Sequence, residues 1–257
     1  MSAGQDAARR RALVTGSTSG IGRATAIRLA ASGHDVTINY SRDAARADEV
    51  LAELHEHGGT HRAVRADVSA EADVRELVAA AAGPDGRLDA LVNNAGTTMS
   101  TPQADLDGID LDEWDRVMAV NVRSVVQVTR AAAPALRAAG GSIVNIASIV
   151  GLRPTTQPLV YPASKAAVVS LTRTLSRALA PEIRVNAVAP GWTAGGWMER
   201  TLGADYGERM AERATVTPLR RNGTFEDVAA SVEALLTMHP FVTGEVIVVD
   251  GGFSATT

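Results

Sequence analysis

Short apolar segments alternate with helix-length stretches along the whole chain, and this alternation limits the possible folds more than any other feature. A strand, a helix and a second strand in succession join parallel strands through a crossover helix that covers the sheet. The pattern therefore predicts an α/β fold, a three-layer α-β-α sandwich around a seven-stranded parallel sheet. The expected strands are 12–14, 36–38, 63–64, 88–92, 142–146, 184–188 and 245–249, and the expected helices are 21–32, 43–57, 70–82, 112–138, 161–180 and 224–238.

Composition supports this interpretation and excludes several classes of protein. Hydrophobic residues make up 46% of the 257 residues and aromatic residues only 4%, as expected for buried strands of Ala, Val, Leu and Ile. No linker divides the chain, so we expect one domain over residues 1–257. The net charge is -4 without a long basic tract, so nucleic-acid binding is not expected. No apolar run reaches membrane-spanning length and cysteine is absent, so we expect a soluble cytoplasmic protein.

Three histidines, His55, His57 and His61, lie close together after the second expected helix. No acidic cluster accompanies them, and glycines follow the helix there. We therefore predict a solvated helix end and no metal site.

The glycine-rich segment 15–22 lies between the first expected strand and the first expected helix. Its glycines permit a tight turn and a close approach of the backbone to a phosphate group. The N-terminus of the helix offers unpaired N–H groups and a partial positive charge to the same anion. Glycine is also an ordinary loop residue, so the prediction depends on the position of the segment. The residues predicted to form this phosphate site are Gly16, Ser17, Thr18, Gly20, Ile21 and Gly22.

Polar residues end the next three strands, at the edge where open α/β sheets bind ligands. The second strand ends in Tyr40, Ser41 and Arg42, with no acidic residue before Asp43. An acidic residue there would bind a ribose 2′-hydroxyl, whereas a serine and an arginine suit a 2′-phosphate. The alternative is an exposed loop arginine. The other two strand ends are Asp67-Val68 and Asn93-Asn94-Ala95-Gly96, which are also ordinary turn residues.

Tyr161 and Lys165 are four residues apart in an expected helix, so their side chains project from the same face. An ammonium ion beside a phenol favours the phenolate and lowers its pKa from about 10. Such a tyrosine can give or take a proton near neutral pH. Alone, the pair is more often a half-buried tyrosine beside a solvated lysine, so its meaning depends on the other motifs.

Two further polar residues occupy unusual positions. Ser148 follows the strand 142–146 at its carboxyl end. Asn121 lies in the middle of the expected helix 112–138, where asparagine is unfavourable by propensity.

Together these motifs resemble the short-chain dehydrogenase/reductase family in order and spacing, including the twelve residues between Ser148 and Tyr161, over nearly the whole chain. The resemblance implies a Rossmann-type fold and an NADP(H)-dependent oxidoreductase acting on CH–OH groups, broadly similar to 3-oxoacyl-acyl-carrier-protein reductases. The matching pieces are Thr15-Gly16-x-x-x-Gly20-x-Gly22, Asp67, Asn93-Asn94-Ala95-Gly96, Asn121, Ser148, Tyr161-x-x-x-Lys165, Asn186 and Pro190-Gly191.

The resemblance also implies the role of each residue. Tyr161 is expected to be the acid in ketone reduction and the base in alcohol oxidation, while Lys165 lowers its pKa and holds the nicotinamide ribose. Ser148 is expected to hydrogen-bond the substrate oxygen, and Asn121 to position a water that relays protons to Lys165. The remaining cofactor contacts are expected from Asp67 and Val68 to the adenine, from Asn94, Ala95 and Gly96 to its ribose, and from Pro190, Gly191 and Thr193 beside the nicotinamide.

One position departs from the family pattern. Many relatives carry a threonine four residues after the Pro-Gly glycine, where it grips the nicotinamide carboxamide. This chain has Gly195 there, and the nearest hydroxyl is that of Thr193. Either Thr193 takes over the contact or the loop grips less firmly.

The Gly-rich and then polar segment 191–218 interrupts the strand–helix alternation and is predicted to be a lid. The alternative is a surface hairpin whose aromatic residues pack only on each other. As a lid, the segment favours a substrate with one reactive carbonyl and a compact apolar or ring-bearing body. The expected pocket walls are Trp192, Trp197, Met198 and Leu202 from the lid, and Pro154, Gln157 and Leu159 opposite.

The leading hypothesis is an NADP(H)-dependent reductase of ketones or dehydrogenase of secondary alcohols, with NAD(H) less favoured. The alternatives are a 3-oxoacyl-acyl-carrier-protein or acetoacetyl-CoA reductase, and a regulator that binds NADP without turnover. The expected partners are a small carbonyl or alcohol substrate and further copies of the chain, without nucleic acid or membrane. A homotetramer is expected because the helices 112–138 and 161–180 carry more apolar surface than one sheet face covers.

Overall fold

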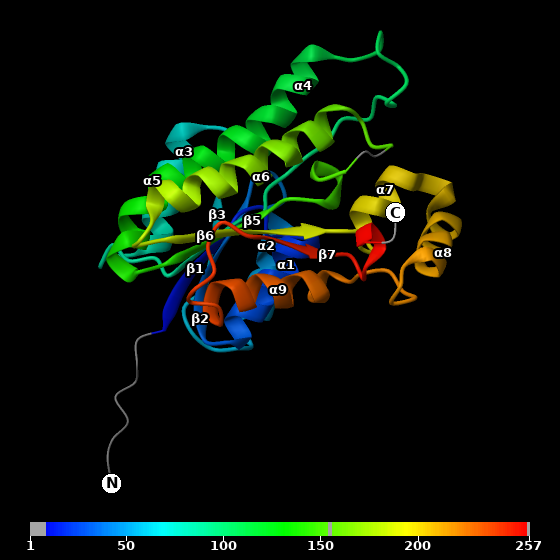
Figure 1. The fold of residues 1–257 in the computed structure, drawn as a ribbon. Helices are drawn as coiled ribbons and strands as arrows, with labels where there is room; N and C mark the ends of the chain where they lie inside the picture. The colour runs from blue at the N-terminus through cyan, green and yellow to red at the C-terminus, as the bar shows by residue number, and fades with distance from the viewer. Residues whose placement is uncertain (1–8, 154–155, 256–257) are drawn as a thin grey trace.

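A seven-stranded parallel sheet runs through the middle of the molecule in the computed structural model, which describes residues 9–153 and 156–255 (Figure 1). The strand order is β3-β2-β1-β4-β5-β6-β7, so the direction of winding reverses between β1 and β4. The strands are β1 (Arg10–Val14), β2 (His34–Tyr40), β3 (Arg62–Arg65), β4 (Ala90–Asn93), β5 (Ser142–Ile146), β6 (Arg184–Pro190) and β7 (Val246–Val249).

Helices cover both faces of this sheet, and the predicted three-layer α-β-α fold is confirmed (Figure 1). The apolar side chains between the layers form two main clusters, one centred on Leu29 and Ile38 and the other on Leu77 and Leu91. One face carries α1 (Gly20–Ala31), α2 (Ala44–His55) and α9 (Phe225–Thr237), and the other carries α3 (Glu71–Ala82), α5 (Ser124–Ala139) and α6 (Val160–Leu179).

The expected helix 112–138 is not continuous. It consists of α4 (Leu111–Met118), a π-helical turn η1 (Ala119–Arg123) and α5. The π turn has a wider hydrogen-bonding pattern than the α-helices on either side, and such turns occur frequently at functional sites. Asn121 lies in this turn with only 1% of its surface exposed.

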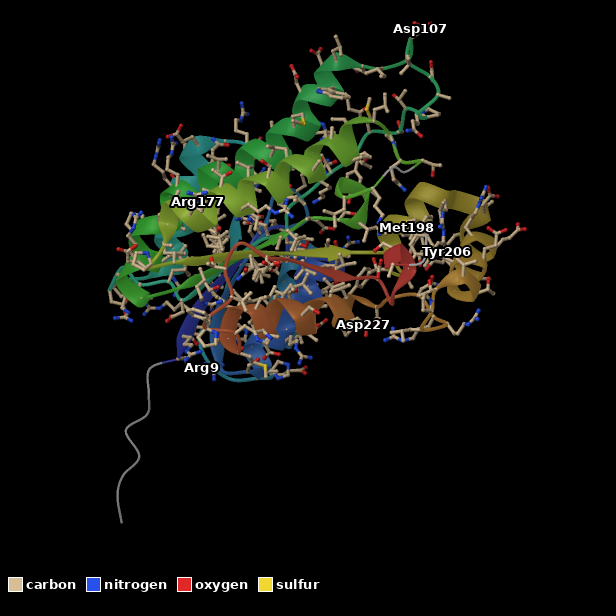
Figure 2. The ribbon with its side chains drawn as sticks, viewed as in Figure 1. Arg9, Asp107, Arg177, Met198, Tyr206 and Asp227 are labelled. Atoms are coloured by element: carbon tan, nitrogen blue, oxygen red, sulfur yellow. The ribbon has the colours of Figure 1, made fainter. Side chains whose placement is uncertain are left out.

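The segment after β6 folds as α7 (Gly196–Leu202), a short 3-10 turn η3 (Gly203–Asp205) and α8 (Tyr206–Val216), beside the carboxyl edge of the sheet (Figure 1). Figure 2 shows Met198 and Tyr206 on this part of the molecule. The Tyr206 hydroxyl accepts a hydrogen bond from the backbone N–H of Gly195 at 3.1 Å, which ties α8 to the loop that leaves β6.

The helices predicted to form the tetramer interface bury part of their apolar surface within the chain itself. Val125 and Val128 in α5 are buried against the sheet, whereas Val126 is 41% exposed. Other large exposed apolar side chains, Phe241 and Met238, lie beyond α9 instead. None of the helices in the described ranges is long and apolar enough to cross a membrane.

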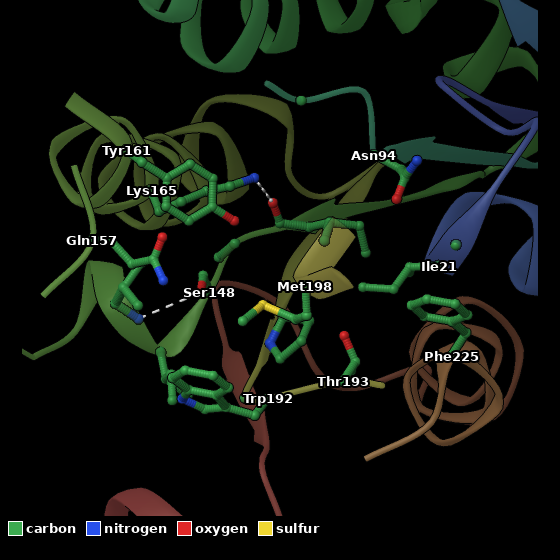
Figure 3. A pocket seen from close by; sticks show the side chains of 18 of the residues that line it. Ile21, Asn94, Ser148, Gln157, Tyr161, Lys165, Trp192, Thr193, Met198 and Phe225 are labelled. Atoms are coloured by element: carbon green, nitrogen blue, oxygen red, sulfur yellow. Dashed lines mark hydrogen bonds between the residues drawn. The ribbon is translucent and has the colours of Figure 1, made fainter. Parts of the chain in front are cut away.

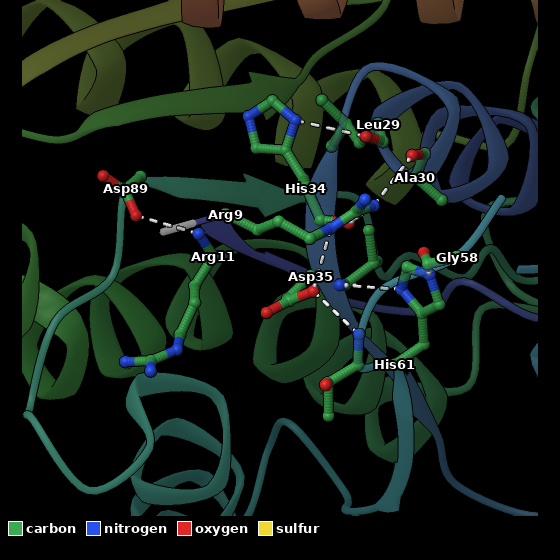
Figure 4. Close-up of polar contacts among 11 residues, drawn as sticks. Arg9, Arg11, Leu29, Ala30, His34, Asp35, Gly58, His61 and Asp89 are labelled. Carbon is green, nitrogen blue, oxygen red and sulfur yellow. Dashed lines mark hydrogen bonds and ion pairs between the residues drawn. The ribbon is translucent and has the colours of Figure 1, made fainter. Parts of the chain in front are cut away.

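The histidine prediction is wrong for His61, which is buried rather than solvated. Its Nδ1 accepts a hydrogen bond from the Val36 N–H at 3.0 Å, and its Nε2 lies 2.8 Å from the Gly58 carbonyl oxygen (Figure 4). These contacts require the neutral ring with its proton on Nε2. Within the described residues no group of three or more side chains is arranged to hold a metal ion.

We expect this histidine to make the fold less stable in mild acid. Burial lowers the pKa of His61, and this effect outweighs the hydrogen bond to the Gly58 carbonyl oxygen, which raises it, while the charges of His55 and Arg9 lower it further. Below about pH 6.5 the unfolded chain therefore binds more protons than the folded chain, and the free energy of unfolding falls by at most about 1.4 kcal/mol per pH unit.

Urea unfolding of the wild type and of His61→Asn, at about pH 7.5 and about pH 5.5, measures this effect. The asparagine can still accept the Val36 bond but does not titrate, so its stability should change less with pH. His57→Asn is the control, because His57 is exposed. Equal pH dependence in the wild type and His61→Asn would contradict the assignment.

Candidate active site

A cavity of about 280 Å³ lies at the carboxyl ends of β1, β4, β5 and β6, on both sides of the point where the winding reverses (Figure 3). Ile21 and Phe225 lie at one end of it, and Gln157 and Trp192 at the other (Figure 3). Open α/β sheets bind ligands at this position. The predicted site residues that line the cavity are Gly16, Gly20, Ile21, Asn94, Gly96, Ser148, Tyr161, Lys165, Pro190, Gly191 and Thr193.

The glycine-rich turn brings the N-terminus of α1 to one end of the cavity. Gly16 has a φ of +60°, and a Cβ atom on it would lie 2.8 Å from the Ala95 backbone. A Cβ atom on Gly22 would lie 2.4 Å from the Asn94 side-chain nitrogen. That nitrogen donates to the carbonyl oxygens of Thr15 and Gly16 at 2.9 and 2.8 Å. The glycines therefore permit close packing of turn, strand and helix, which leaves the helix N-terminus open to an anion.

Ser17 supports the turn rather than facing the cavity. It is fully buried, and its hydroxyl donates to the Val14 carbonyl oxygen at 2.7 Å and accepts from the Asn39 N–H at 2.9 Å. Asn39 also accepts a hydrogen bond from the Gly16 N–H at 3.1 Å through its side chain. Of the predicted phosphate residues, Thr18 and Gly22 likewise do not line the cavity.

The residues predicted to bind the adenine and the 2′-phosphate lie outside the cavity, at the ends of β2 and β3. Ser41 and Arg42 are exposed, and no hydrogen bond or ion pair joins the Arg42 side chain to another described residue. Asp67 accepts bonds from the Ser69 hydroxyl and N–H at 2.7 and 2.8 Å, which lower its pKa. The charges of Arg116 and Arg42 lower the pKa of Asp67 to a smaller extent. Tyr40 is half-buried and Val68 is buried.

Tyr161, Ser148 and Lys165 come together at the middle of the cavity, from the first two turns of α6 and from the segment after β5 (Figure 3). The Ser148 hydroxyl hydrogen-bonds the Tyr161 phenol. The Lys165 Nζ donates to the Ile146 carbonyl oxygen at 2.8 Å and lies 5.7 Å from the centroid of the Tyr161 ring. Lys165 is 4% exposed and is the only lysine in the chain.

The pKa of Tyr161 shifts in the direction opposite to the one predicted from the sequence. Burial raises it to about 12, and the Ser148 hydrogen bond only partly opposes this effect. Burial also lowers the pKa of Lys165 to about 8, so the charge expected to stabilise the phenolate is itself disfavoured. Among the protein's own groups, Tyr161 is therefore a protonated phenol at neutral pH, as a proton donor must be.

Asn121 holds the loop after β4 against α6. Its side-chain oxygen accepts from the Thr97 N–H at 2.8 Å, and its nitrogen donates to the Thr97 carbonyl oxygen and the Ser164 hydroxyl, each at 2.9 Å. A Cβ atom on Gly96 would lie 3.5 Å from the Asn121 oxygen and 3.7 Å from the Lys165 Nζ. Asn121 and Lys165 thus both lie close to Gly96, although Asn121 does not line the cavity.

Gly195 cannot be replaced by a threonine in this backbone. Its φ is +131°, and a Cβ atom would lie 2.5 Å from the Phe225 ring. Thr193 instead lines the cavity (Figure 3), and its segment is held by backbone bonds of Trp192 and Ala194 to Gly223, both at 3.0 Å. Thr193 therefore remains the candidate hydroxyl for the predicted nicotinamide contact.

We expect Thr193→Val to raise the Kd for the nicotinamide cofactor by roughly threefold to tenfold, the value of one hydrogen bond. Fluorescence titration with NADPH measures this change. Thr174→Val on the exposed face of α6 is the matched control and should bind like the wild type. Unchanged binding by Thr193→Val would assign Thr193 a purely structural role.

The predicted substrate walls are described only in part. Trp192, Met198 and Gln157 line the cavity, whereas Leu159 does not. Pro154 and the side chain of Trp197 lie outside the described parts of the structure. Phe225, at the start of α9, was missed because no local motif marks a residue that enters the site from another part of the chain.

Comparison with known proteins assigns this chain to a family. The family model described as "Enoyl-(Acyl carrier protein) reductase" matches residues 16–254. The "Granaticin polyketide synthase putative ketoacyl reductase 2" of Streptomyces violaceoruber is 44% identical over 94% of this chain and 94% of its own length. The 3-oxoacyl-[acyl-carrier-protein] reductase of Synechocystis sp. is 37% identical, with 94% and 95% covered.

Solved structures agree with this assignment. A blue fluorescent protein from a metagenomic library, in complex with NADPH, has a TM-score of 0.83 and 35% identity over 95% of this chain and 98% of that one. NAD+-bound xylitol dehydrogenase has a TM-score of 0.86 and 31% identity with the same coverage. The chain belongs to the short-chain dehydrogenase/reductase family, as its motifs predicted, and it is an oxidoreductase of that family.

Proposed function

We propose that this protein is an NADP(H)-dependent reductase of ketones that also catalyses the reverse oxidation of secondary alcohols. The observation that carries the proposal is the Tyr161 phenol, hydrogen-bonded to Ser148 and facing the same cavity as the N-terminus of α1. The open glycine turn suits a cofactor diphosphate, and the exposed Arg42 suits a 2′-phosphate. The neighbours alone favour neither nicotinamide cofactor, since one holds NADPH and the other NAD+.

The side chains support a simple division of roles. NADPH supplies the hydride when it is bound. Ser148 and Tyr161 hydrogen-bond the substrate carbonyl oxygen, and the Tyr161 hydroxyl donates its proton to that oxygen. Lys165, held by the Ile146 carbonyl oxygen, places a cation beside the phenolate that remains. Asn121 fixes the loop that carries Gly96 opposite Lys165.

Oxidation of NADPH in the presence of a panel of ketones tests this function. We expect cyclohexanone or ethyl acetoacetate to be consumed with formation of the secondary alcohol. NADPH that binds without any turnover would favour the regulator instead.

The names of the relatives specifically favour a second candidate, a reductase of 3-oxoacyl thioesters. A kcat/KM for acetoacetyl-CoA far above that for ethyl acetoacetate would support this candidate over a general ketone reductase.

We further propose that the protein acts as a cytoplasmic homotetramer. The exposed Val126 on α5 supports an interface there, and closed symmetry is the usual arrangement of such oligomers. Light scattering at working concentration tests this state, and a monomer would contradict it.

A further inference from the structure

A second cavity of about 760 Å³ lies beside the first and shares two lining residues with it, Gln157 and Trp192. We call it the outer cavity. It is bounded by α8 on one side and by the loops at Ser100 and Thr156 on the other. The shared pair lies at the end of the inner cavity that is remote from the glycine-rich turn (Figure 3).

The inner cavity leaves little room for a substrate once a cofactor is bound. Its 280 Å³ extends from the glycine-rich turn past Lys165 to Ser148. The nicotinamide end of the cofactor and the reacting carbonyl must both fit there, whereas sites for ligands of drug size occupy roughly 300–1,000 Å³. A ketone that carries a long substituent on its carbonyl carbon would therefore extend past Gln157 and Trp192.

Trp192 forms a fixed wall at this exit. The Arg213 guanidinium lies 4.4 Å from the centroid of the Trp192 ring and 4.9 Å from that of Phe253. Cation–π contacts of this kind stabilise by roughly 0.5–2 kcal/mol. The stack joins α8, the loop after β6 and the C-terminal 3-10 turn η4 (Phe253–Ala255), so it holds the wall in place.

The outer cavity is lined by charged and polar side chains together with apolar ones such as Leu202 and Val216, and the lining carries no net charge. Arg209 and Arg213 are one turn apart on α8, and Asp205 and Glu212 balance their charges. No carboxylate of the described residues lies within ion-pair distance of Arg209, so its N–H groups remain available. Together with the hydroxyl of Thr156, the Arg209 N–H groups suit a neutral group that carries hydrogen-bond acceptors.

We propose that the outer cavity binds the distal part of the substrate, a neutral and oxygen-bearing arm that passes Trp192 to reach Arg209. This inference rests on the proposed function and changes the expected substrate from a compact body to an elongated one. The reacting carbonyl stays at Ser148 and Tyr161, so the arm adds affinity without altering the chemistry.

Three acetoacetate esters with the same reacting group test the arm. Ethyl acetoacetate is short, decyl acetoacetate carries a long apolar arm, and the ester of triethylene glycol monomethyl ether carries an arm of similar length with ether oxygens. We expect the glycol ester to have a KM lower than the ethyl ester by about tenfold, as two hydrogen bonds would give, and lower than the decyl ester. Equal KM values for all three, or a decyl ester that binds best, would overturn the inference.

A pair of arginine variants identifies the binding group. The advantage of the glycol ester is the KM of the ethyl ester divided by the KM of the glycol ester. We expect Arg209→Leu to reduce this ratio by roughly threefold or more. Arg87→Leu, exposed before β4 at the opposite end of the sheet, should retain the full advantage. An advantage that survives in Arg209→Leu would exclude Arg209 as the contact.

Binding measured without turnover separates this inference from the proposed function. Calorimetric titration of the three esters into Tyr161→Phe with NADPH reports the affinity of each arm even if the wild type reduces none of them. If the wild type reduces ethyl acetoacetate but the glycol ester binds no more tightly, the proposed function is supported and the proposed binding of a distal arm is refuted.

Discussion

Tyr161→Phe is expected to lower kcat for ketone reduction by roughly 10²- to 10⁴-fold, the usual contribution of a positioned general acid. The substitution removes only the hydroxyl, the atom that hydrogen-bonds Ser148 and that would protonate the substrate oxygen. The ring stays between α6 and the cavity, so the fold and the cofactor site should be preserved. Initial rates with saturating NADPH and ethyl acetoacetate measure the loss.

The control for this prediction is cofactor binding by the same variant. NADPH should bind Tyr161→Phe within about threefold of the wild-type affinity, because only one hydroxyl is lost. If the phenylalanine variant retains most of its rate, another group is the acid. A parallel loss of NADPH binding would assign Tyr161 to cofactor positioning instead.

The second large effect concerns the cofactor. We expect the wild type to use NADPH over NADH by roughly tenfold to a hundredfold in kcat/KM, the value of charge-assisted bonds of about 1.5–3 kcal/mol. Arg42 carries this expectation because it is exposed at the end of β2, where no acidic residue is present to repel a 2′-phosphate. Arg42→Ala should remove most of the preference by weakening NADPH while leaving NADH nearly unchanged.

Arg46→Ala is the matched control for Arg42. It removes an equal charge from the first turn of α2, but Arg46 forms an ion pair with Asp43 at 3.6 Å. The control should keep the cofactor preference of the wild type. Equal or better use of NADH by the wild type would refute the assignment of Arg42, whatever the variants show.

The sequence predicted the elements that depend on neighbouring residues. The apolar runs gave the seven strands, and their alternation with helical stretches gave the three layers. The spacing of Tyr161 and Lys165 placed both on one face of α6, and the glycines at 16 and 20 marked the turn that leads into α1. These features can be predicted from the sequence because helix periodicity and turn geometry are properties of short segments.

Contacts between distant segments could not be predicted in this way. Asn121 stands out as an unfavourable residue in a helix, but the sequence indicates neither the π turn in which it lies nor its bonds to Thr97 and Ser164. The resemblance pointed to a missing threonine at Gly195, whereas the reason is the Phe225 ring, which comes from the start of α9. His61 appeared solvated from its polar neighbours and is buried because β2 and β3 pair around it.

The fold class and the residues that we propose for proton transfer were therefore determined by the sequence itself, since each is encoded in local spacing and residue type. The tertiary structure alone decided the electrostatics of Tyr161 and Lys165 and the shape of the space beyond them. Burial shifts both pKa values, and burial is a property of the whole fold rather than of two residues one turn apart. The wall at Trp192 likewise exists only because Arg213 and Phe253 meet it from segments that are separate in the sequence.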